Sequence, residues 1–205
     1  IIVKGVTKFK DNFEFDVIPD RIEAGTFMIA TAMCKGKVKL NNVNPNHLSI
    51  VIDKLTQSGS NIIFDNNTIT IESRSRPEPV DIETLIYPGY PTDLQAQWMA
   101  LMSIANGSSK IIDNIYTDRF THIAELERLG ANINLNSNIA TINGVKSLNG
   151  AQVMSTDIRA SASLVIAGLF ADNETKISRI YHIDRGYENI ESKFLKLGAN
   201  IIRLK

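Results

Sequence analysis

Apolar residues recur at spacings of three and four in separate segments of the chain. In chain order the sets are Leu48, Val51, Ile52 and Leu55, then Phe120, Ile123, Leu126 and Leu129, then Tyr187, Ile190, Phe194 and Leu197. This spacing places each set on one face of a helix, so it predicts amphipathic helices. A glycine follows each set (Gly59, Gly130 and Gly198), and glycine favours the left-handed residue of a C-terminal cap.

The segments around these glycines resemble one another, which indicates an internal repeat. A short strand is expected before each amphipathic helix, for example at residues 37–40 and 109–112. A strand hairpin is expected after the helix, as at residues 61–64 and 68–71. The sequence therefore predicts three units, at about residues 19–75, 76–143 and 144–205.

Each unit also contains a helix of a different kind, beginning at Asp20, Asp93 or Asp157. In the third unit, residues 160–171 carry no charge on any face, and a helix that is apolar all round is a buried helix. We therefore expect an α/β fold with three buried helices at its centre, sheets and amphipathic helices outside them, and the polar first turns of the buried helices side by side. Cys34, within the first of these helices, is expected to pack in the core.

The two ends of the chain are expected to be strands that lack partners within their own units. Residues 1–6 resemble residues 140–145, the outgoing arm of the second hairpin, and residues 1–18 are interpreted as connecting strands. Residues 200–204 are expected to form the last strand. These ends either pair with each other or pair with residues outside the chain, and the start at Ile1 favours a fragment of a longer polypeptide.

Composition narrows the classes of function. Lys plus Arg equals Asp plus Glu at 22 each, so neither nucleic acid nor an anionic membrane is expected as a partner. No apolar run approaches the roughly 20 residues that span a bilayer. A single cysteine forms no intramolecular disulfide and favours a cytoplasmic location. Because no metal-ligand spacing and no glycine-rich phosphate loop is found, we expect neither a metal nor a bound cofactor.

Candidate chemistry gathers at the starts of the buried helices. Asp93 and Asp157 are either ordinary helix N-caps or groups that also face a ligand. Arg119, Arg159 and Arg185 occupy related positions, where guanidinium groups near helix N-termini could bind a phosphate or a carboxylate. The alternative is solvation, or pairing with neighbouring aspartates. His182 could exchange protons near neutral pH or could be a structural histidine.

Six segments together resemble one family, the UDP-N-acetylglucosamine 1-carboxyvinyltransferases. They are residues 19–27, 90–97, 118–120, 150–153, 156–163 and 181–187. The resemblance implies one domain of an inside-out α/β barrel, built from three pseudo-symmetric βαβαββ units around buried helices. It covers only the C-terminal half of such an enzyme, whose active site lies between the halves. The chain alone is therefore expected to be inactive.

The resemblance also implies roles for individual residues. Asp93 and Asp157 match acidic residues proposed for proton transfer. The substrate-binding positions that match are Ile115, Tyr116, Arg119, Arg159, Arg185 and His182. The implied reaction moves the enolpyruvyl group of phosphoenolpyruvate to the 3-hydroxyl of UDP-N-acetylglucosamine and releases phosphate, as the first committed step of peptidoglycan synthesis. The missing N-terminal half is the implied partner, and a non-catalytic binding or scaffold domain of the same fold is the alternative.

Overall fold

The structure is a computed structural model that describes residues 1–9 and 11–204. Its elements, in chain order, are α1 (Arg21–Met33), β1 (Lys37–Asn41), η1 (Pro45–Leu48), α2 (Ser49–Gln57), β2 (Asn61–Phe64), β3 (Thr68–Glu72), β4 (Ile82–Thr84), η2 (Thr92–Leu94), α3 (Gln95–Met102), β5 (Ser108–Asp113), α4 (Ile123–Arg128), β6 (Asn132–Asn136), β7 (Ile139–Asn143), β8 (Gln152–Met154), α5 (Ile158–Phe170), β9 (Lys176–Ser178), η3 (Ile180–Arg185) and α6 (Ile190–Lys196). The residues of the first two expected units each contain a helix, a strand, a second helix and a strand hairpin in that order, whereas the described residues of the third contain α5, β9 and α6 without such a hairpin.

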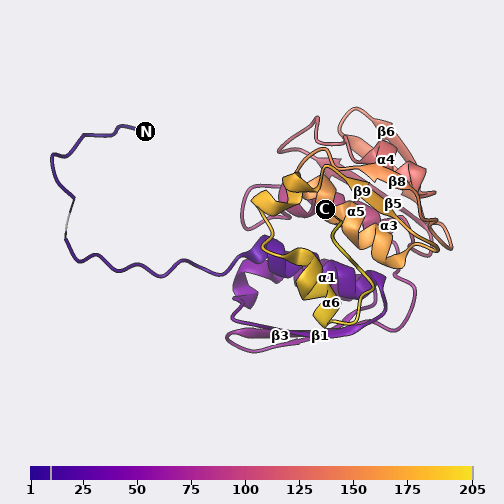
Figure 1. Ribbon diagram of the computed structural model, residues 1–205, viewed down its shortest axis with the longest axis horizontal. Coiled ribbons are helices and arrows are strands. Elements are labelled where there is room, and N and C mark those ends of the chain that lie inside the picture. Colours follow the sequence, from indigo (N-terminus) through magenta and orange to yellow (C-terminus); the bar gives the residue numbers. More distant parts are fainter. Residues whose placement is uncertain (10, 205) are drawn as a thin grey trace.

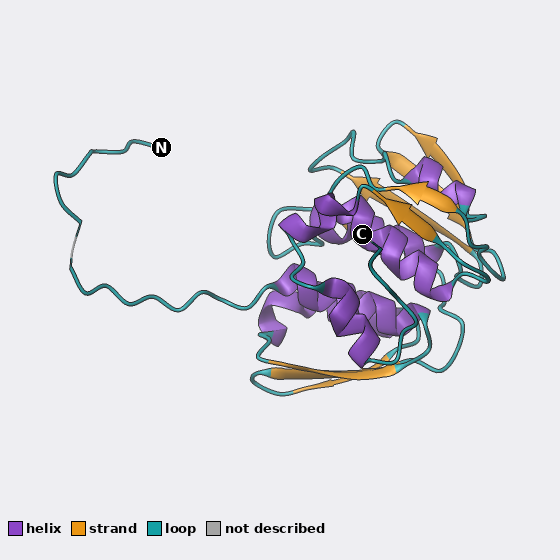
Figure 2. Cartoon of the chain, viewed as in Figure 1, coloured by secondary structure: helices purple, strands orange, loops and turns teal. Residues whose placement is uncertain are grey.

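Helices occupy the centre of the molecule and strands lie outside them, as Figure 2 shows. Helices α1, α3 and α5, one from each unit, pack against one another. Met28, Trp98 and Leu164 on these helices are 0% exposed. The expectation of three central buried helices is confirmed. A helix that is apolar on every face is most stable where no face meets water, because burial removes its apolar surface from water.

Each sheet belongs to one unit. The first has strand order β1-β3-β2 and the second β4-β5-β7-β6, in which β4 is parallel to β5 and the other pairs are antiparallel. In the first sheet Ile71 lies opposite both Val38 and Ile62. Ile69 and Ile71 are fully buried on the inner face, as period-two alternation predicts. The described part of the third unit, residues 144–204, contains the parallel pair β8-β9 and no further strand.

The three amphipathic helices end in the same way. Gly59, Gly130 and Gly198 have φ values of 99°, 96° and 95°, the left-handed region that glycine adopts without strain. The N–H of the residue after each glycine donates to the carbonyl of a buried residue in the last turn, namely Leu55, Leu126 or Phe194. The predicted caps are confirmed, and their near identity supports the repeat.

Two predicted core positions are wrong. Cys34 is exposed, because α1 ends at Met33 and Cys34 forms its C-cap instead of lying within it. Leu197 was assigned to the apolar face of the third amphipathic helix, but it is 52% exposed. Helix α6 ends at Lys196, so Leu197 leaves the helical face.

The chain ends are not strands. Residues 1–9 and 11–19 lead away from the body (Figure 1) and form no strand, and large apolar side chains there, such as Phe13 and Phe15, are exposed. Residues 200–204, all of which the structure describes, do not form a strand either. With α5 and β9, residues 200–204 line a cavity of about 950 Å³ in the third unit. No helix of the described residues is long and apolar enough to cross a membrane.

Candidate functional site

Asp93 lies between two arginines that come from different units. Its Oδ1 accepts a hydrogen bond from Nη1 of Arg119 at 2.6 Å, and its Oδ2 accepts one from Nη2 of Arg159 at 3.0 Å. Arg119 precedes α4 in the second unit, and Arg159 lies in the first turn of α5 in the third. The Asp93 side chain remains 37% exposed, whereas those of Arg119 and Arg159 are 23% and 15% exposed. The cluster is therefore a half-open ionic site at the rim of the central helices.

The arginines also set the charge state of Asp93. Partial burial would raise the pKa of this carboxyl, but the hydrogen bond from Arg119 and the positive charges of Arg159 and Arg119 outweigh it and hold the pKa below its ordinary value. Asp93 is thus ionised at neutral pH. A carboxylate held by two cations is a weak base until at least one of them turns away.

The capping interpretation is wrong for Asp93 and right for Asp157. Pro91 is the N-cap of η2 and no side chain caps it, and α3 begins only at Gln95. Asp93 therefore lies inside the 3-10 turn, and its carboxylate points to the arginines instead of to backbone amides.

Asp157 caps α5 through a single oxygen. Its Oδ1 accepts from the backbone N–H groups of Arg159 and Ala160 at 2.7 and 3.0 Å. The positive end of the helix dipole stabilises this carboxylate. Its Oδ2 accepts no hydrogen bond from the described residues, so Asp157 can cap the helix and still present an acceptor. Capping also fixes the turn from which Arg159 extends to Asp93.

Arg159 is held from behind by Tyr187. The guanidinium carbon lies 5.6 Å from the centre of the Tyr187 ring, a distance that permits a cation–π interaction. The Tyr187 hydroxyl is hydrogen-bonded to Thr26 at 2.8 Å and accepts from Gln97 at 3.2 Å. Nη1 of Arg159 is buried and has no hydrogen-bond partner in residues 1–9 and 11–204. This donor can therefore bind an additional acceptor.

Arg185 and His182 lie outside the ionic cluster. Arg185 is exposed, and the structure gives it no ion pair within the described chain. Its neighbour Gly186 is close to the cluster, since a Cβ on Gly186 would lie 3.4 Å from Nη1 of Arg159. The His182 ring packs against the Tyr181 ring at a tilt of 34°, with ring centres 4.3 Å apart, and its buried Nδ1 has no partner among the residues described.

Ile115 and Tyr116 form an exposed apolar turn beside the cluster. Their side chains are 44% and 58% exposed, and the guanidinium carbon of Arg119 lies 5.8 Å from the Tyr116 ring centre. The backbone N–H groups of both residues donate to Asp113 at 3.0 and 2.9 Å. This turn can therefore offer a ligand its carbonyl groups and apolar side chains, while its amides are already used.

Sequence reasoning missed Asp113 and assigned Tyr187 only to an apolar helix face. Asp113 is 0% exposed and ends β5, directly before the turn that carries Ile115. An aspartate two residues before a turn amide is a recognisable side-chain turn signal. The role of the Tyr187 hydroxyl had no such signal, because its partners come from α1 and α3.

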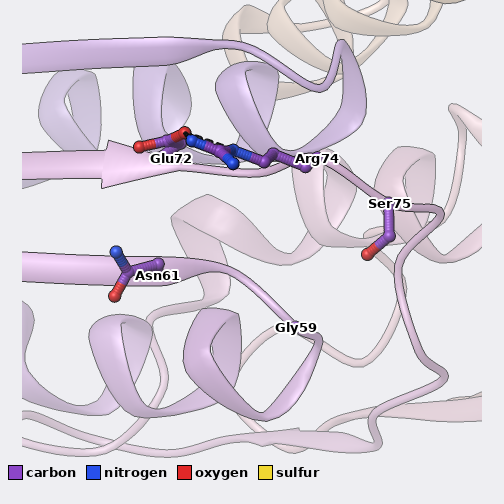
Figure 3. Close-up of a pocket in the computed structure, with 5 residues that line it drawn as sticks. All are labelled: Gly59, Asn61, Glu72, Arg74 and Ser75. Carbon is purple, nitrogen blue, oxygen red and sulfur yellow. Dashed lines mark hydrogen bonds and ion pairs between the residues drawn. The ribbon is translucent and has the colours of Figure 1, made fainter.

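Among the described residues, neither a group of metal ligands nor the cavity beside the first sheet coincides with the cluster. The described residues contain no group of three or more His, Cys, Asp or Glu side chains that could hold a metal ion. Figure 3 shows a cavity of about 370 Å³ at the end of the first sheet, where Arg74 pairs with Glu72. Its lining residues are Gly59, Asn61, Glu72, Arg74 and Ser75, none of which is a candidate site residue.

Comparison with known proteins identifies the family. The model of EPSP synthase (3-phosphoshikimate 1-carboxyvinyltransferase) matches residues 1–194. Proteins of Geobacter metallireducens and Aliarcobacter butzleri named UDP-N-acetylglucosamine 1-carboxyvinyltransferase are 54% and 53% identical over 190 and 207 residues, which is 93% and 100% of this chain. These alignments cover 46% and 49% of the relatives, so the chain spans about half the length of the curated relatives it matches.

Solved structures confirm the expected fold. The enolpyruvyl transferase NikO from Streptomyces tendae matches with a TM-score of 0.81 and 25% identity, over 90% of this chain and 44% of that one. EPSP synthase from Acinetobacter baumannii shares the fold with a TM-score of 0.61 at 16% identity, over 80% of this chain and 40% of that one. The resemblance found in the sequence is confirmed, and the chain belongs to the EPSP synthase family.

Proposed function

We propose that this chain is one half of an enolpyruvyl transferase that moves the enolpyruvyl group of phosphoenolpyruvate to the 3-hydroxyl of UDP-N-acetylglucosamine and releases phosphate. The observation that carries the proposal is the bridge from Arg119 and Arg159 to Asp93, at 2.6 and 3.0 Å. The names of the relatives supply the acceptor, UDP-N-acetylglucosamine, and the transferred carboxyvinyl group. Phosphoenolpyruvate is the donor that the family resemblance implies. The family resemblance further leads us to propose that this reaction is the first committed step of peptidoglycan synthesis and that it takes place in the cytoplasm.

The bridge links the arrival of an anion to the activation of a base. Phosphoenolpyruvate carries a phosphate and a carboxylate, both of which bind guanidinium groups well. When these anions bind Arg119 or Arg159, Asp93 loses the hydrogen bond and the nearby positive charge that lower its pKa. Asp93 then becomes a stronger base for the proton of the sugar hydroxyl. Nη1 of Arg159 is buried and unpartnered in the described chain, so it provides a further donor to the anion once Arg159 turns toward it.

The remaining candidates act around this centre. Asp157, with its unused Oδ2, transfers a proton at the opposite end of the reacting group. Arg185 and His182 extend the substrate surface beyond the cluster, and both must move toward it or be brought to it as the site closes. Ile115 and Tyr116 hold the UDP-sugar through carbonyl and apolar contacts. The other half of the enzyme completes the site, so the chain alone is inactive.

The test is Asp93→Asn in the full-length enzyme that carries this half. Removing a general base lowers turnover by roughly 10²–10⁴-fold, and phosphate release in a steady-state assay measures it. Asp53→Asn is the control, because Asp53 is an exposed carboxylate on α2 that contacts Gln57. Turnover of Asp93→Asn within threefold of the parent would remove Asp93 from the role of base.

A binding measurement separates an enzyme half from a non-catalytic scaffold. Titration calorimetry of this chain with UDP-N-acetylglucosamine should give weak binding that strengthens when the other half is added. Absence of binding with both halves present would favour the scaffold.

A further inference from the structure

Asp113 is a fully buried carboxylate that the proposed reaction does not use. It is 0% exposed at the end of β5. Its Oδ1 accepts from the Thr84 hydroxyl at 2.6 Å and from the amides of Ile115 and Tyr116 at 3.0 and 2.9 Å, while its Oδ2 accepts from the Thr92 hydroxyl at 2.7 Å. Four donors satisfy both oxygens, so this buried carboxyl group leaves neither oxygen without a hydrogen bond.

The four donors come from three separate segments. Thr84 ends β4, Thr92 begins η2, and Ile115 and Tyr116 form the exposed turn after β5. Thr84 also accepts from the backbone N–H of Asn114 at 3.1 Å, which ties the start of the same turn to β4. One side chain therefore joins the turn proposed to face the UDP-sugar to the residue directly before Asp93.

We infer that Asp113 is a positioning residue that couples the Ile115–Tyr116 turn to Asp93. The inference rests on the proposed function, since it assigns the two coupled segments to the nucleotide sugar and to the base. Its physical basis is that Oδ1 and Oδ2 belong to one rigid planar group, so displacement of one set of donors rotates the acceptor of the other. A sugar nucleotide that displaces the turn thereby shifts Asp113, and through Thr92 it shifts Asp93, which lies 20 residues before Asp113 in the chain.

Thr92→Val gives the sharpest test, because it removes only the Oδ2 contact and retains the size of the side chain. Coupling predicts that amide hydrogen exchange at Ile115 and Tyr116 in this chain becomes at least threefold faster, although the substitution touches neither residue. Asp113→Ala, if it folds, accelerates the same amides further. Asp81→Asn is the control, since this exposed carboxylate accepts from the Lys110 amide at 2.7 Å at the other end of β5. Unchanged exchange at both amides in Thr92→Val would refute the coupling.

Kinetics of the full-length enzyme provides the second readout. Thr92→Val should lower kcat about tenfold and leave KM for UDP-N-acetylglucosamine within twofold, whereas Asp113→Ala should lower kcat and raise KM at least fivefold. A purely structural role would reduce the active fraction and leave KM unchanged in both variants, which would overturn the inference. An inactive parent enzyme would instead contradict the proposed function, and the exchange experiment would still decide the coupling.

Discussion

Burial of His122 should make the free energy of unfolding of this protein depend on pH, because burial lowers the pKa of its imidazole. The side chain is 1% exposed at the start of α4, and its Nε2 has no partner in the described chain. Burial lowers the pKa of His122 from 6.5 to about 4; the carboxylates of Asp157 and Asp113 oppose this shift, and the charge of Arg119 adds to it. The folded protein therefore keeps this imidazole neutral at pH values at which the unfolded chain protonates it.

The sign and size of the effect follow from linkage. Because the pKa in the folded state is below the value in the unfolded state, the stabilisation is complete above pH 6.5 and is lost as the pH falls toward 4. Protonation of His122, with a pKa of 6.5 in the unfolded chain and about 4 in the folded protein, lowers the free energy of unfolding by about 2 kcal/mol between pH 7 and pH 5. The loss reaches about 3 kcal/mol at pH 4.

Urea unfolding at pH 7, 6 and 5 measures this loss, with His122→Gln and His122→Leu as replacements that do not titrate. All other ionisable groups are common to parent and variants, so the difference between their pH dependences isolates His122. Each variant should lose about 2 kcal/mol less than the parent between pH 7 and pH 5. Equal losses in parent and variants would show that burial does not keep this histidine neutral.

Two further substitutions test how the units are joined. Arg76→Lys should cost roughly 2 kcal/mol of unfolding free energy, because one ammonium cannot replace a guanidinium that donates at 2.7 to 3.2 Å to the carbonyls of Ile104, Ala105, Gly144 and Val145. Urea unfolding measures it against exposed Arg74→Lys, and equal stability of the two variants would contradict this role. Gly144→Ala should cost about 3 kcal/mol, since a Cβ there would lie 1.9 Å from the Ala105 carbonyl oxygen. Gly5→Ala, with nothing within 4 Å, is its control, and a thermal midpoint of Gly144→Ala that matches it would show that the backbone yields.

The sequence predicted features that depend on local periodicity and not those that depend on distant contacts. The buried run of α5 and the three glycine caps follow from residues close together in the chain, so they could be predicted. Cys34 and Leu197 were misplaced because each lies one residue beyond the end of a helix, which the apolar pattern does not define.

The candidate site shows the same limit. Arg119 and Arg159 were identified as cations near helix starts, but their common partner Asp93 is 26 and 66 residues away in the chain. The position of Asp113 within its own turn could be predicted from neighbouring residues, whereas its hydrogen bond to Thr92 joins β5 to η2 across 21 residues of chain. Sequence therefore identified the charged groups, and only the packing of the units paired them.

The hydroxyl of Tyr187 has a consequence for how the repeats relate to one another. At this point the first unit supplies a threonine, the second a glutamine amide and the third a phenol, all fully or almost fully buried. Exchanging or reordering the units would leave one of these buried groups without a hydrogen-bond partner. Each such group would lower the free energy of unfolding by about 1–3 kcal/mol. The three units therefore cannot be interchanged, because each contributes a different polar group to the same buried hydrogen-bonded cluster.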